Sequence, residues 1–275
     1  MPELSIIIPT YNSEKFIFSV IESIKVQTFS NYEIIIVDGL STDSTLNTLE
    51  TIVHSNLIIV SEKDKGIYDA MNKGICLAKG EWIYFLGSDD VLFDNQVMER
   101  VFLQHKSIIE NSDIVYGNVL WGDSATLYKG RFSLIELYEE NICHQAIFYR
   151  KSVFEKHGFY SLEFPKYADY FFNIKCFSDL DLKIKYIETI IAKYSLDGFS
   201  SKDYNRDTFL IEKKKLFTEI IKHQLPLTRL IFNVRFPDLM TFHGKLNFIK
   251  HLFKYSFLLI YDSIKDKKLK IIKVK

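Results

Sequence analysis

The sequence predicts an α/β fold in which a mostly parallel sheet is flanked by helices. Short apolar runs, each ended by polar residues or glycine, are typical of strands buried on both faces of a sheet. Segments with apolar residues three or four positions apart separate these runs and predict helices that pack on the sheet. Acidic residues stand where several runs end, and in an open α/β sheet ligands bind at that edge.

Three strand-then-helix units are expected in the first 80 residues. Apolar runs at 4–8, 34–37 and 57–60 predict parallel strands. Apolar residues at helical spacing follow each of them, in residues 16–24, 46–53 and 67–75. A fourth run, Trp82–Leu86, lies between Gly80 and Gly87 and predicts a central buried strand. Further strands are expected over 113–119, 143–150 and 183–194, with short helices between them.

Charge divides the 275-residue chain into two parts. Residues 1–201 carry 18 Lys and Arg against 28 Asp and Glu, whereas residues 202–275 carry 17 against 7. We therefore predict a domain over residues 1–201 and a basic, aromatic-rich helical extension over residues 202–275. The two parts attract each other, or the basic extension lies against an anionic membrane surface. Its aromatic run at 248–261 is far shorter than a bilayer span and predicts an interfacial helix or a packing helix.

The cysteines and the N-terminus point to a reducing compartment. The three cysteines are far apart and no Cys-x-x-Cys pair occurs, so neither a disulfide framework nor a structural zinc site is expected. The chain begins directly with a strand pattern and shows no signal peptide. A cytoplasmic protein is therefore expected, and we expect no nucleic-acid partner.

Two adjacent carboxylates, Asp89 and Asp90, follow the fourth strand. Paired carboxylates repel each other, and their burial costs free energy unless a cation or hydrogen-bond donors compensate. One interpretation is therefore a site for a divalent cation, Mg²⁺ or Mn²⁺, with phosphate oxygens completing its coordination. The alternative is an acidic turn in which aspartate caps the helix that begins near Asp94.

Two other strand ends carry candidate ligand-binding residues. Asp38 follows the second strand and can accept a hydrogen bond from a base or ribose, or it is a turn residue beside Gly39. The loop 9–12 follows the first strand and leads into a helix, which is a ready site for a nucleotide or another anion. The chain has neither the dinucleotide-binding glycine fingerprint nor a P-loop.

Four stretches in order along the chain resemble family 2 glycosyltransferases with the GT-A fold, especially bacterial enzymes that build surface polysaccharides. These stretches are Ser5–Asn12, Ile36–Asp43, Asp64–Gly74 and Gly87–Asp90. The resemblance covers residues 3–195 and implies a GT-A (Rossmann-like) mixed, mostly parallel sheet that forms a catalytic domain. The helical extension at 202–275 falls outside it.

The resemblance also implies roles for individual residues. Binding of the nucleotide and its sugar falls to Pro9, Thr10, Tyr11, Asn12, Asp38, Gly39, Lys65, Gly66, Asp69, Asn72, Ser88 and Asp89. Asp90 would carry the metal, and the run 88–90 would be the counterpart of the family's Asp-x-Asp motif. Ser88 stands at the first position of that motif, which leaves open how much Asp89 contributes to donor binding.

Two later residues complete the expected site. Asp169 begins an apolar helix where related enzymes place their catalytic base, although Ala168 stands where many relatives have Glu. A carboxylate is ionised at neutral pH and can accept a proton, but aspartate is also a common first-turn residue of helices. His144 begins another expected strand and would donate to the leaving diphosphate or approach the metal; the alternative is a structural histidine.

The sequence thus predicts an inverting glycosyltransferase. The donor would be a nucleoside-diphosphate sugar, specifically a UDP-sugar, and the acceptor a hydroxyl of a glycan or lipid-linked molecule in cell-surface polysaccharide synthesis. Residues 202–275 would make a peripheral contact with the inner face of the cell membrane or form a homodimer. The alternatives are a non-catalytic nucleotide-sugar-binding or scaffold protein and a sugar nucleotidyltransferase, which usually carries a glycine-rich basic loop after its first strand.

Overall fold

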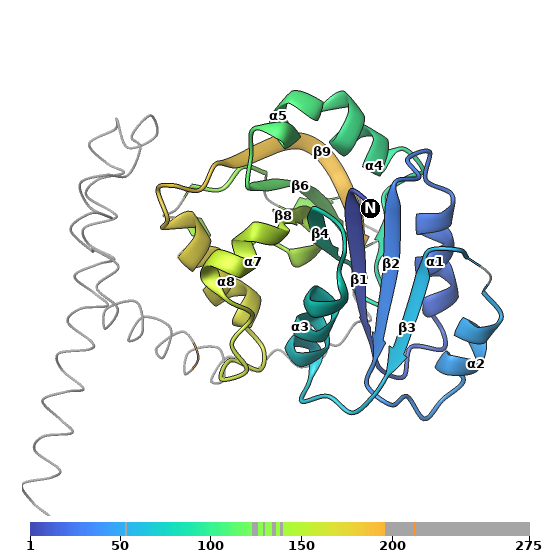
Figure 1. Ribbon diagram of the computed structural model, residues 1–275. Coiled ribbons are helices and arrows are strands. Elements are labelled where there is room, and N and C mark those ends of the chain that lie inside the picture. Colours follow the sequence, from blue (N-terminus) through green and yellow to red (C-terminus); the bar gives the residue numbers. More distant parts are fainter. Residues whose placement is uncertain are drawn as a thin grey trace, which may run out of the picture. The chain divides into compact units, whose positions relative to one another are not determined.

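The computed structural model describes residues 1–52, 54–122, 126–128, 130–133, 136–137, 140–195 and 212, and all of these belong to one compact unit, Met1–Gln224 (Figure 1). Their strands form one sheet in the order β3-β2-β1-β4-β8-β6-β9-β5, with β7 beside β6. Apart from Glu212, the expected extension at 202–275 lies outside the described residues.

The first half of the sheet is parallel, as predicted. Its strands are β1 (Leu4–Thr10), β2 (Tyr32–Asp38), β3 (Leu57–Ser61) and β4 (Trp82–Phe85). The side chains of β1, β2 and β4 are buried throughout, which agrees with their continuous apolar sequences. Thr10 lies opposite Asp38, and Asp38 lies opposite Ser61, so three strands end at one level.

Strand β8 reverses the direction of the sheet and makes it mixed. It is antiparallel to both β4 and β6, whereas β6 and β9 are parallel. The remaining strands are β5 (Val91–Leu92), β6 (Ile114–Trp121), β7 (Thr126–Tyr128), β8 (Ile147–Arg150) and β9 (Ile184–Tyr194). Because β8 runs opposite to β4, the residues that precede it lie beside the carboxyl end of β4. These residues include the 3₁₀ turn His144–Ala146, which replaces the strand start expected there.

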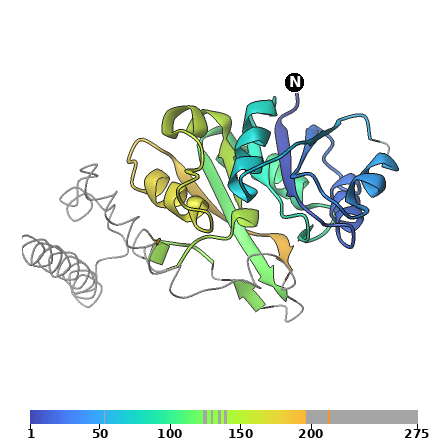
Figure 2. The same cartoon turned by 90° about the horizontal axis from the view of Figure 1, so that it is seen from below.

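Helices cover both faces of the sheet (Figures 1 and 2). One face packs against α1 (Ile17–Lys25), α2 (Thr45–Glu50), α4 (Val97–Glu99), a π-helical turn (Arg100–Gln104) and α5 (Lys106–Glu110). The other faces α3 (Ile67–Leu77), α7 (Lys151–His157) and α8 (Ala168–Phe177). Alternation along β1 explains this division, because Ile6 and Ile8 join the core cluster with α1, while Ile7 contacts Gly74 of α3.

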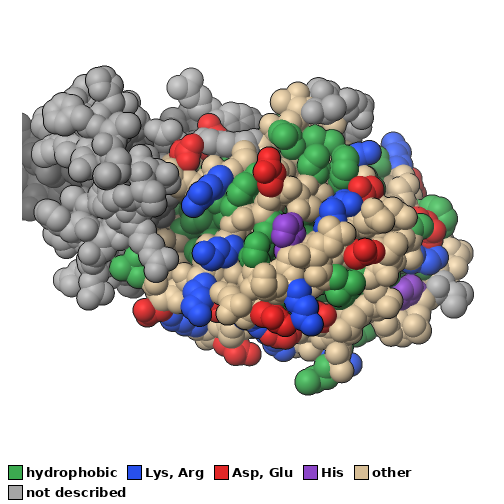
Figure 3. All heavy atoms as spheres, turned by 90° about the horizontal axis from the view of Figure 1, so that it is seen from above, with side chains coloured by type: hydrophobic (Ala, Val, Ile, Leu, Met, Phe, Trp, Pro, Cys, Tyr) green, Lys and Arg blue, Asp and Glu red, His purple; other side chains and the backbone are tan. Residues whose placement is uncertain are grey.

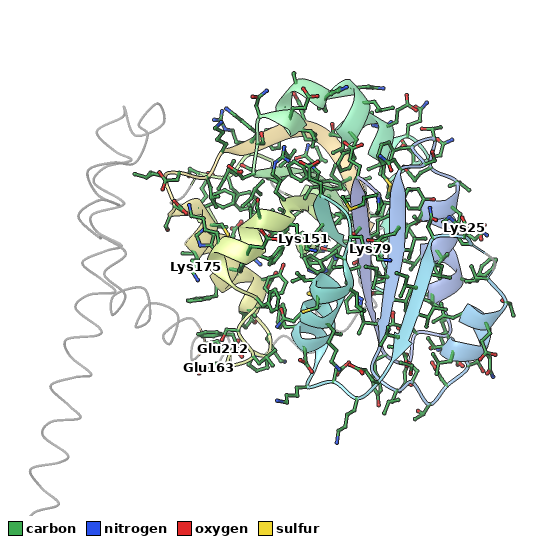
Figure 4. The ribbon with its side chains drawn as sticks, viewed as in Figure 1. Lys25, Lys79, Lys151, Glu163, Lys175 and Glu212 are labelled. Atoms are coloured by element: carbon green, nitrogen blue, oxygen red, sulfur yellow. The ribbon has the colours of Figure 1, made fainter. Side chains whose placement is uncertain are left out.

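Two lysines labelled in Figure 4 bind helix ends. Lys151 Nζ donates to the carbonyl of Ala78 at 2.7 Å, just after α3, and Lys175 Nζ donates to the carbonyl of His157 at 2.6 Å, at the end of α7. Cations are favourable at such termini because helix carbonyls are unpaired there.

Acidic and basic side chains are interspersed on the face at the amino ends of the parallel strands, which Figure 3 shows. The acidic strand ends described below lie at the opposite edge of the sheet. No helix of the described residues is both long and apolar enough to cross a membrane.

Candidate active site

The loops after β1, β2 and β3 are tied together around Asp38. This carboxylate is fully buried and accepts hydrogen bonds from the backbone and hydroxyl of Ser41 and, at 2.6 Å, from the hydroxyl of Ser61. The backbone of Asn12 donates to Ser41 Oγ at 2.8 Å, and its side-chain oxygen accepts from the backbone of Thr42 at 2.8 Å. The predicted residues Asn12 and Asp38 therefore belong to one rigid set of loops.

Gly39 and Gly66 extend this set toward the start of α3. A Cβ atom at Gly39 would lie 2.5 Å from Asp64 Oδ2, so a side chain there would displace the Asp64 carboxylate. Asp64 also accepts a hydrogen bond from the backbone of Gly66 at 2.9 Å, and Gly66 has a φ of 113°, which favours glycine. The backbone of Gly39 donates to Thr10 at 2.9 Å. Asp64 was not predicted as a site residue, although it opens the stretch Asp64–Gly74.

The other predicted residues of this region differ in accessibility. Tyr11 is 61% exposed and Lys65 is exposed, so both are accessible to a ligand. Pro9 is buried within β1. The side chain of Asp69 accepts a hydrogen bond from the backbone of Lys65 at 3.0 Å. The amide of Asn72 is hydrogen-bonded at both ends to the backbone of Tyr160, at 2.9 and 3.0 Å, so it fixes a neighbouring loop.

Asp90 is a buried carboxylate beside a second one. Its side chain accepts hydrogen bonds from Gln145 Nε2 and, at 2.9 Å, from the backbone of Ser195. Burial, reinforced by the charge of Asp89, raises the pKa of Asp90 to about 7. Within the described residues no lysine or arginine forms an ion pair with it. A Cβ atom at Gly87 would contact carboxylate oxygens of both aspartates, so the two groups converge on one point.

Ser88 joins this acidic turn to the loop after β1. The hydroxyl groups of Ser88 and Ser13 are 2.7 Å apart, and the backbone of Ser13 donates to Thr45 Oγ1 at 2.8 Å. Contacts therefore run without interruption from the loops around Asp38 to the turn that carries Asp90.

The 3₁₀ turn before β8 contacts this carboxylate through Gln145 and carries two buried polar atoms without partners. Neither His144 Nε2 nor Gln145 Oε1 has a hydrogen-bond partner in the part of the chain that is described, and both atoms are buried. Burial lowers the pKa of His144, opposed by the charge of Asp169, so the imidazole is neutral at neutral pH. Buried polar atoms without partners are costly, which indicates that a ligand supplies the missing contacts.

Asp169, in the first turn of α8, is held by two side chains. The hydroxyl of Tyr68 lies 2.5 Å from Asp169 Oδ1, and Asn141 Nδ2 donates to Asp169 Oδ2 at 2.7 Å. The same hydroxyl lies 2.9 Å from the carbonyl of Lys166. A hydroxyl has only one proton to donate. The bond to the carboxylate is the shorter and the charge-assisted one, so we assign the proton of Tyr68 to the bond with Asp169.

Asp90 and Asp169 are bound to one short segment, because Gln145 donates to Asp90 and Asn141, four residues earlier, donates to Asp169. Burial and the charges of both aspartates raise the pKa of the Cys143 thiol. Together with the contacts from Asp38 to Ser88, this places the three predicted aspartates along one edge of the sheet. Sequence reasoning missed Tyr68 and Asn141 as candidate site residues; of these, only Tyr68, inside a recognised stretch, carried a signal.

The residues present fit a divalent cation that is coordinated by the protein and by a bound ligand together. No group of three or more His, Cys, Asp or Glu side chains that could hold a metal by itself occurs in the described ranges. Asp89 and Asp90 nevertheless offer two convergent carboxylates, and hard divalent cations prefer oxygen ligands. Phosphate oxygens of a bound nucleotide would complete the coordination.

Solved structures place this fold in the GT-A class of glycosyltransferases. The chain is similar to S. aureus TarS 1–349 in complex with UDP, with a TM-score of 0.65 and 19% identity over 92% of this chain and 72% of that one. It is also similar to the mannosyltransferase PcManGT of Pyrobaculum calidifontis in complex with GDP-Man and Mn²⁺, with a TM-score of 0.60 and 15% identity over 80% and 64% of the two chains. The predicted fold class is confirmed.

Sequence comparison then gives the family. The model of the family described as "Glycosyl transferase family 2" matches residues 5–177, and the chain belongs to this family. It is 42% identical over 203 residues to a "PGL/p-HBAD biosynthesis glycosyltransferase" of Mycobacterium bovis, covering 72% of this chain and 78% of that relative. It is 36% identical over 128 residues to the Escherichia coli glucosyltransferase WfaP, covering 43% and 51%. The protein is a glycosyltransferase, as predicted.

Proposed function

We propose that the protein is an inverting glycosyltransferase that transfers a sugar from a UDP-sugar to a hydroxyl of a glycan or lipid-linked acceptor. The observation that carries this proposal is that Asp90 and Asp169 are hydrogen-bonded to the same short segment, Asp90 through Gln145 and Asp169 through Asn141, at the carboxyl edge of the sheet. Relatives support the substrates. WfaP is named a UDP-Glc:alpha-D-GlcNAc-diphosphoundecaprenol beta-1,3-glucosyltransferase, and TarS 1–349 has been solved with UDP-GlcNAc.

Asp89 and Asp90 would hold the divalent cation, Mg²⁺ or Mn²⁺. When bound, such a cation neutralises the negative charge that develops on a leaving diphosphate. The exposed ring of Tyr11 and the loops around Asp38 would bind the base and ribose. His144 is neutral and its Nε2 atom is buried without a partner, so it would donate a hydrogen bond to the diphosphate.

Asp169 would accept the proton of the acceptor hydroxyl as that oxygen attacks the anomeric carbon. Each carboxylate oxygen accepts one hydrogen bond from a described side chain and has a second lone pair for this proton. A single displacement of this kind inverts the anomeric centre and needs no enzyme nucleophile.

The substrates are tested by incubating the protein with a panel of nucleotide sugars and Mn²⁺ or Mg²⁺ and measuring the free nucleoside diphosphate. We expect release from a UDP-sugar, suppressed by a chelator, and a product of inverted anomeric configuration by NMR. A product with the donor's configuration would refute the single displacement.

The base is tested separately with Asp169→Asn. This change should reduce transfer by at least 100-fold, within the range that general base catalysis contributes, while calorimetry shows donor affinity retained. Unchanged turnover would remove Asp169 as the base.

The cellular setting follows from the relatives and from the charge of the extension. We propose synthesis of cell-surface polysaccharide at the cytoplasmic face of the membrane, because the name of WfaP specifies an undecaprenol-linked acceptor. Membrane contact or a homodimer through residues 202–275 stays a prediction, since that segment lies outside the described residues. Family membership favours glycosyl transfer over the non-catalytic and nucleotidyltransferase alternatives.

A further inference from the structure

A row of hydrogen-bonded side chains leads from the core to Asp169. The hydroxyl of Tyr149 donates to Asn173 Oδ1 at 2.6 Å, and Asn173 Nδ2 donates to Asn141 Oδ1 at 2.9 Å. Asn141 Nδ2 then donates to Asp169 Oδ2 at 2.7 Å. The row therefore joins strand β8, helix α8 and the segment before the 3₁₀ turn.

The charge of Asp169 sets the direction of every bond in this row. An ionised carboxylate can only accept hydrogen bonds, so Asn141 must present its nitrogen to it and its oxygen to Asn173. Asn173 must then present its nitrogen to Asn141, which leaves its oxygen for the hydroxyl of Tyr149. All three donors point toward the carboxylate, and this arrangement complements the ionised form of Asp169.

Packing alone does not explain Asn173. Its side chain is 0% exposed and lies four residues after Asp169, one turn further along an otherwise apolar part of α8. A buried amide is costly unless its polar atoms are paired, and an aliphatic side chain would fill the same volume without that cost. Both polar atoms of Asn173 are used in the row that ends at Asp169.

We propose that Asn141 and Asn173 are positioning residues that hold the Asp169 carboxylate aimed at the acceptor hydroxyl. This inference rests on the proposed function, in which Asp169 is the base. Tyr68 fixes one carboxylate oxygen and Asn141 fixes the other, so the group cannot turn about its Cβ–Cγ bond without losing a bond to each.

Another group of the site, Asp90, titrates close to neutral pH, with a pKa of about 7. Saturating metal would keep Asp90 ionised in every variant, so a difference between their rate profiles reports on Asp169. In the described part of the chain, the titratable side chains that face it are Tyr68, Tyr128, Cys143, His144, Tyr149 and Tyr160. Burial raises the pKa of the tyrosines and the cysteine and lowers the pKa of the histidine, so all six are neutral from about pH 6.5 to 8.

The experiment measures kcat against pH at saturating donor and metal for Asn141→Leu, Asn173→Leu and the double variant. Asn141→Leu removes a donor to the carboxylate, so we expect the acidic side of the profile to move up by about one pH unit, with the rate recovering at higher pH and the donor KM unchanged. Asn173→Leu should move it in the same direction by less. The double variant should match Asn141→Leu alone, because Asn173 acts through Asn141.

Asn118→Leu is the matched control, because Asn118 is also buried and its oxygen also accepts from a tyrosine hydroxyl, that of Tyr186 at 3.1 Å. Its profile should coincide with that of the parent. If a thermal melt shows that Asn173→Leu is unfolded, the variant Asn141→Leu, at a partly exposed position, tests the inference alone. Unshifted profiles together with an inactive Asp169→Asn would overturn this inference and leave the proposed function intact. An active Asp169→Asn would overturn both.

Discussion

Asp90→Asn should stabilise the metal-free protein at pH 8 while it abolishes metal-dependent donor binding. The substitution keeps the shape of the side chain and removes its charge. The carbonyl oxygen of the new amide can still accept from the backbone of Ser195. Gln145 Oε1, which has no hydrogen-bond partner within the described residues, can turn to accept from the new amide nitrogen. The turned amide exchanges the hydrogen bond from Gln145 Nε2 for one accepted by Gln145 Oε1, so the variant keeps one hydrogen bond between these two side chains.

The magnitude follows from the pKa of Asp90. The pKa of an ordinary aspartate side chain is 3.8, and that of Asp90 in the folded protein is about 7. Because the folded value is the higher one, the protonated carboxyl favours folding at low pH, and this contribution is lost as the pH rises from 3.8 through 7. At about 1.4 kcal/mol per pH unit, the ionised group at pH 8 costs on the order of 4 kcal/mol of folding free energy. Asparagine avoids this cost.

Thermal denaturation with a chelator, from pH 5 to pH 8, is the assay. In a chain of this size, 4 kcal/mol corresponds to a rise in Tm on the order of 10 °C at pH 8, and the difference should shrink toward pH 5. Mn²⁺ with donor should stabilise the parent and not the variant. Asp89→Asn is the comparison variant, because Asp89 is only half-buried and its charge is the smaller cause of the Asp90 shift, so its substitution should raise Tm by less than Asp90→Asn does. A variant no more stable than the parent in chelator at pH 8 would refute the reasoning.

Two further predictions concern helix α3. Tyr68→Phe removes a charge-assisted hydrogen bond from Asp169 and should lower kcat about tenfold at neutral pH with donor KM unchanged. A tenfold rise in the donor KM would show a role in binding instead. Gly74→Ala places a Cβ atom against Ile7 Cγ2 and should destabilise the fold by roughly 1–3 kcal/mol in urea denaturation. Leu77→Ala, at an exposed position of the same helix, should change stability by less than about 0.5 kcal/mol, and a Gly74 variant as stable as this control would contradict the packing described.

Local patterns were sufficient to predict the elements of the fold. Strands β1 to β4 are continuous apolar runs, and α1 buries residues at helical spacing, so both are recognisable from a few neighbouring residues. The acidic residues were recognisable for the same reason, because Asp38 and Asp90 directly follow such runs. The interruption of the helix after Asp94 by a π-helical turn was not predicted, since its apolar spacing is close to that of an α-helix.

By itself, the sequence determined which residues lie at strand ends and helix starts, and therefore which carboxylates can face a ligand. Only the tertiary structure decided what each carboxylate contacts. Gln145 is 55 residues from Asp90, and Tyr68 is 101 residues from Asp169. These pairs meet because β8 runs antiparallel beside β4 and because α3 and α8 cover the same face of the sheet. Strand order and direction arise from packing across the whole domain, and no short stretch of sequence encodes them.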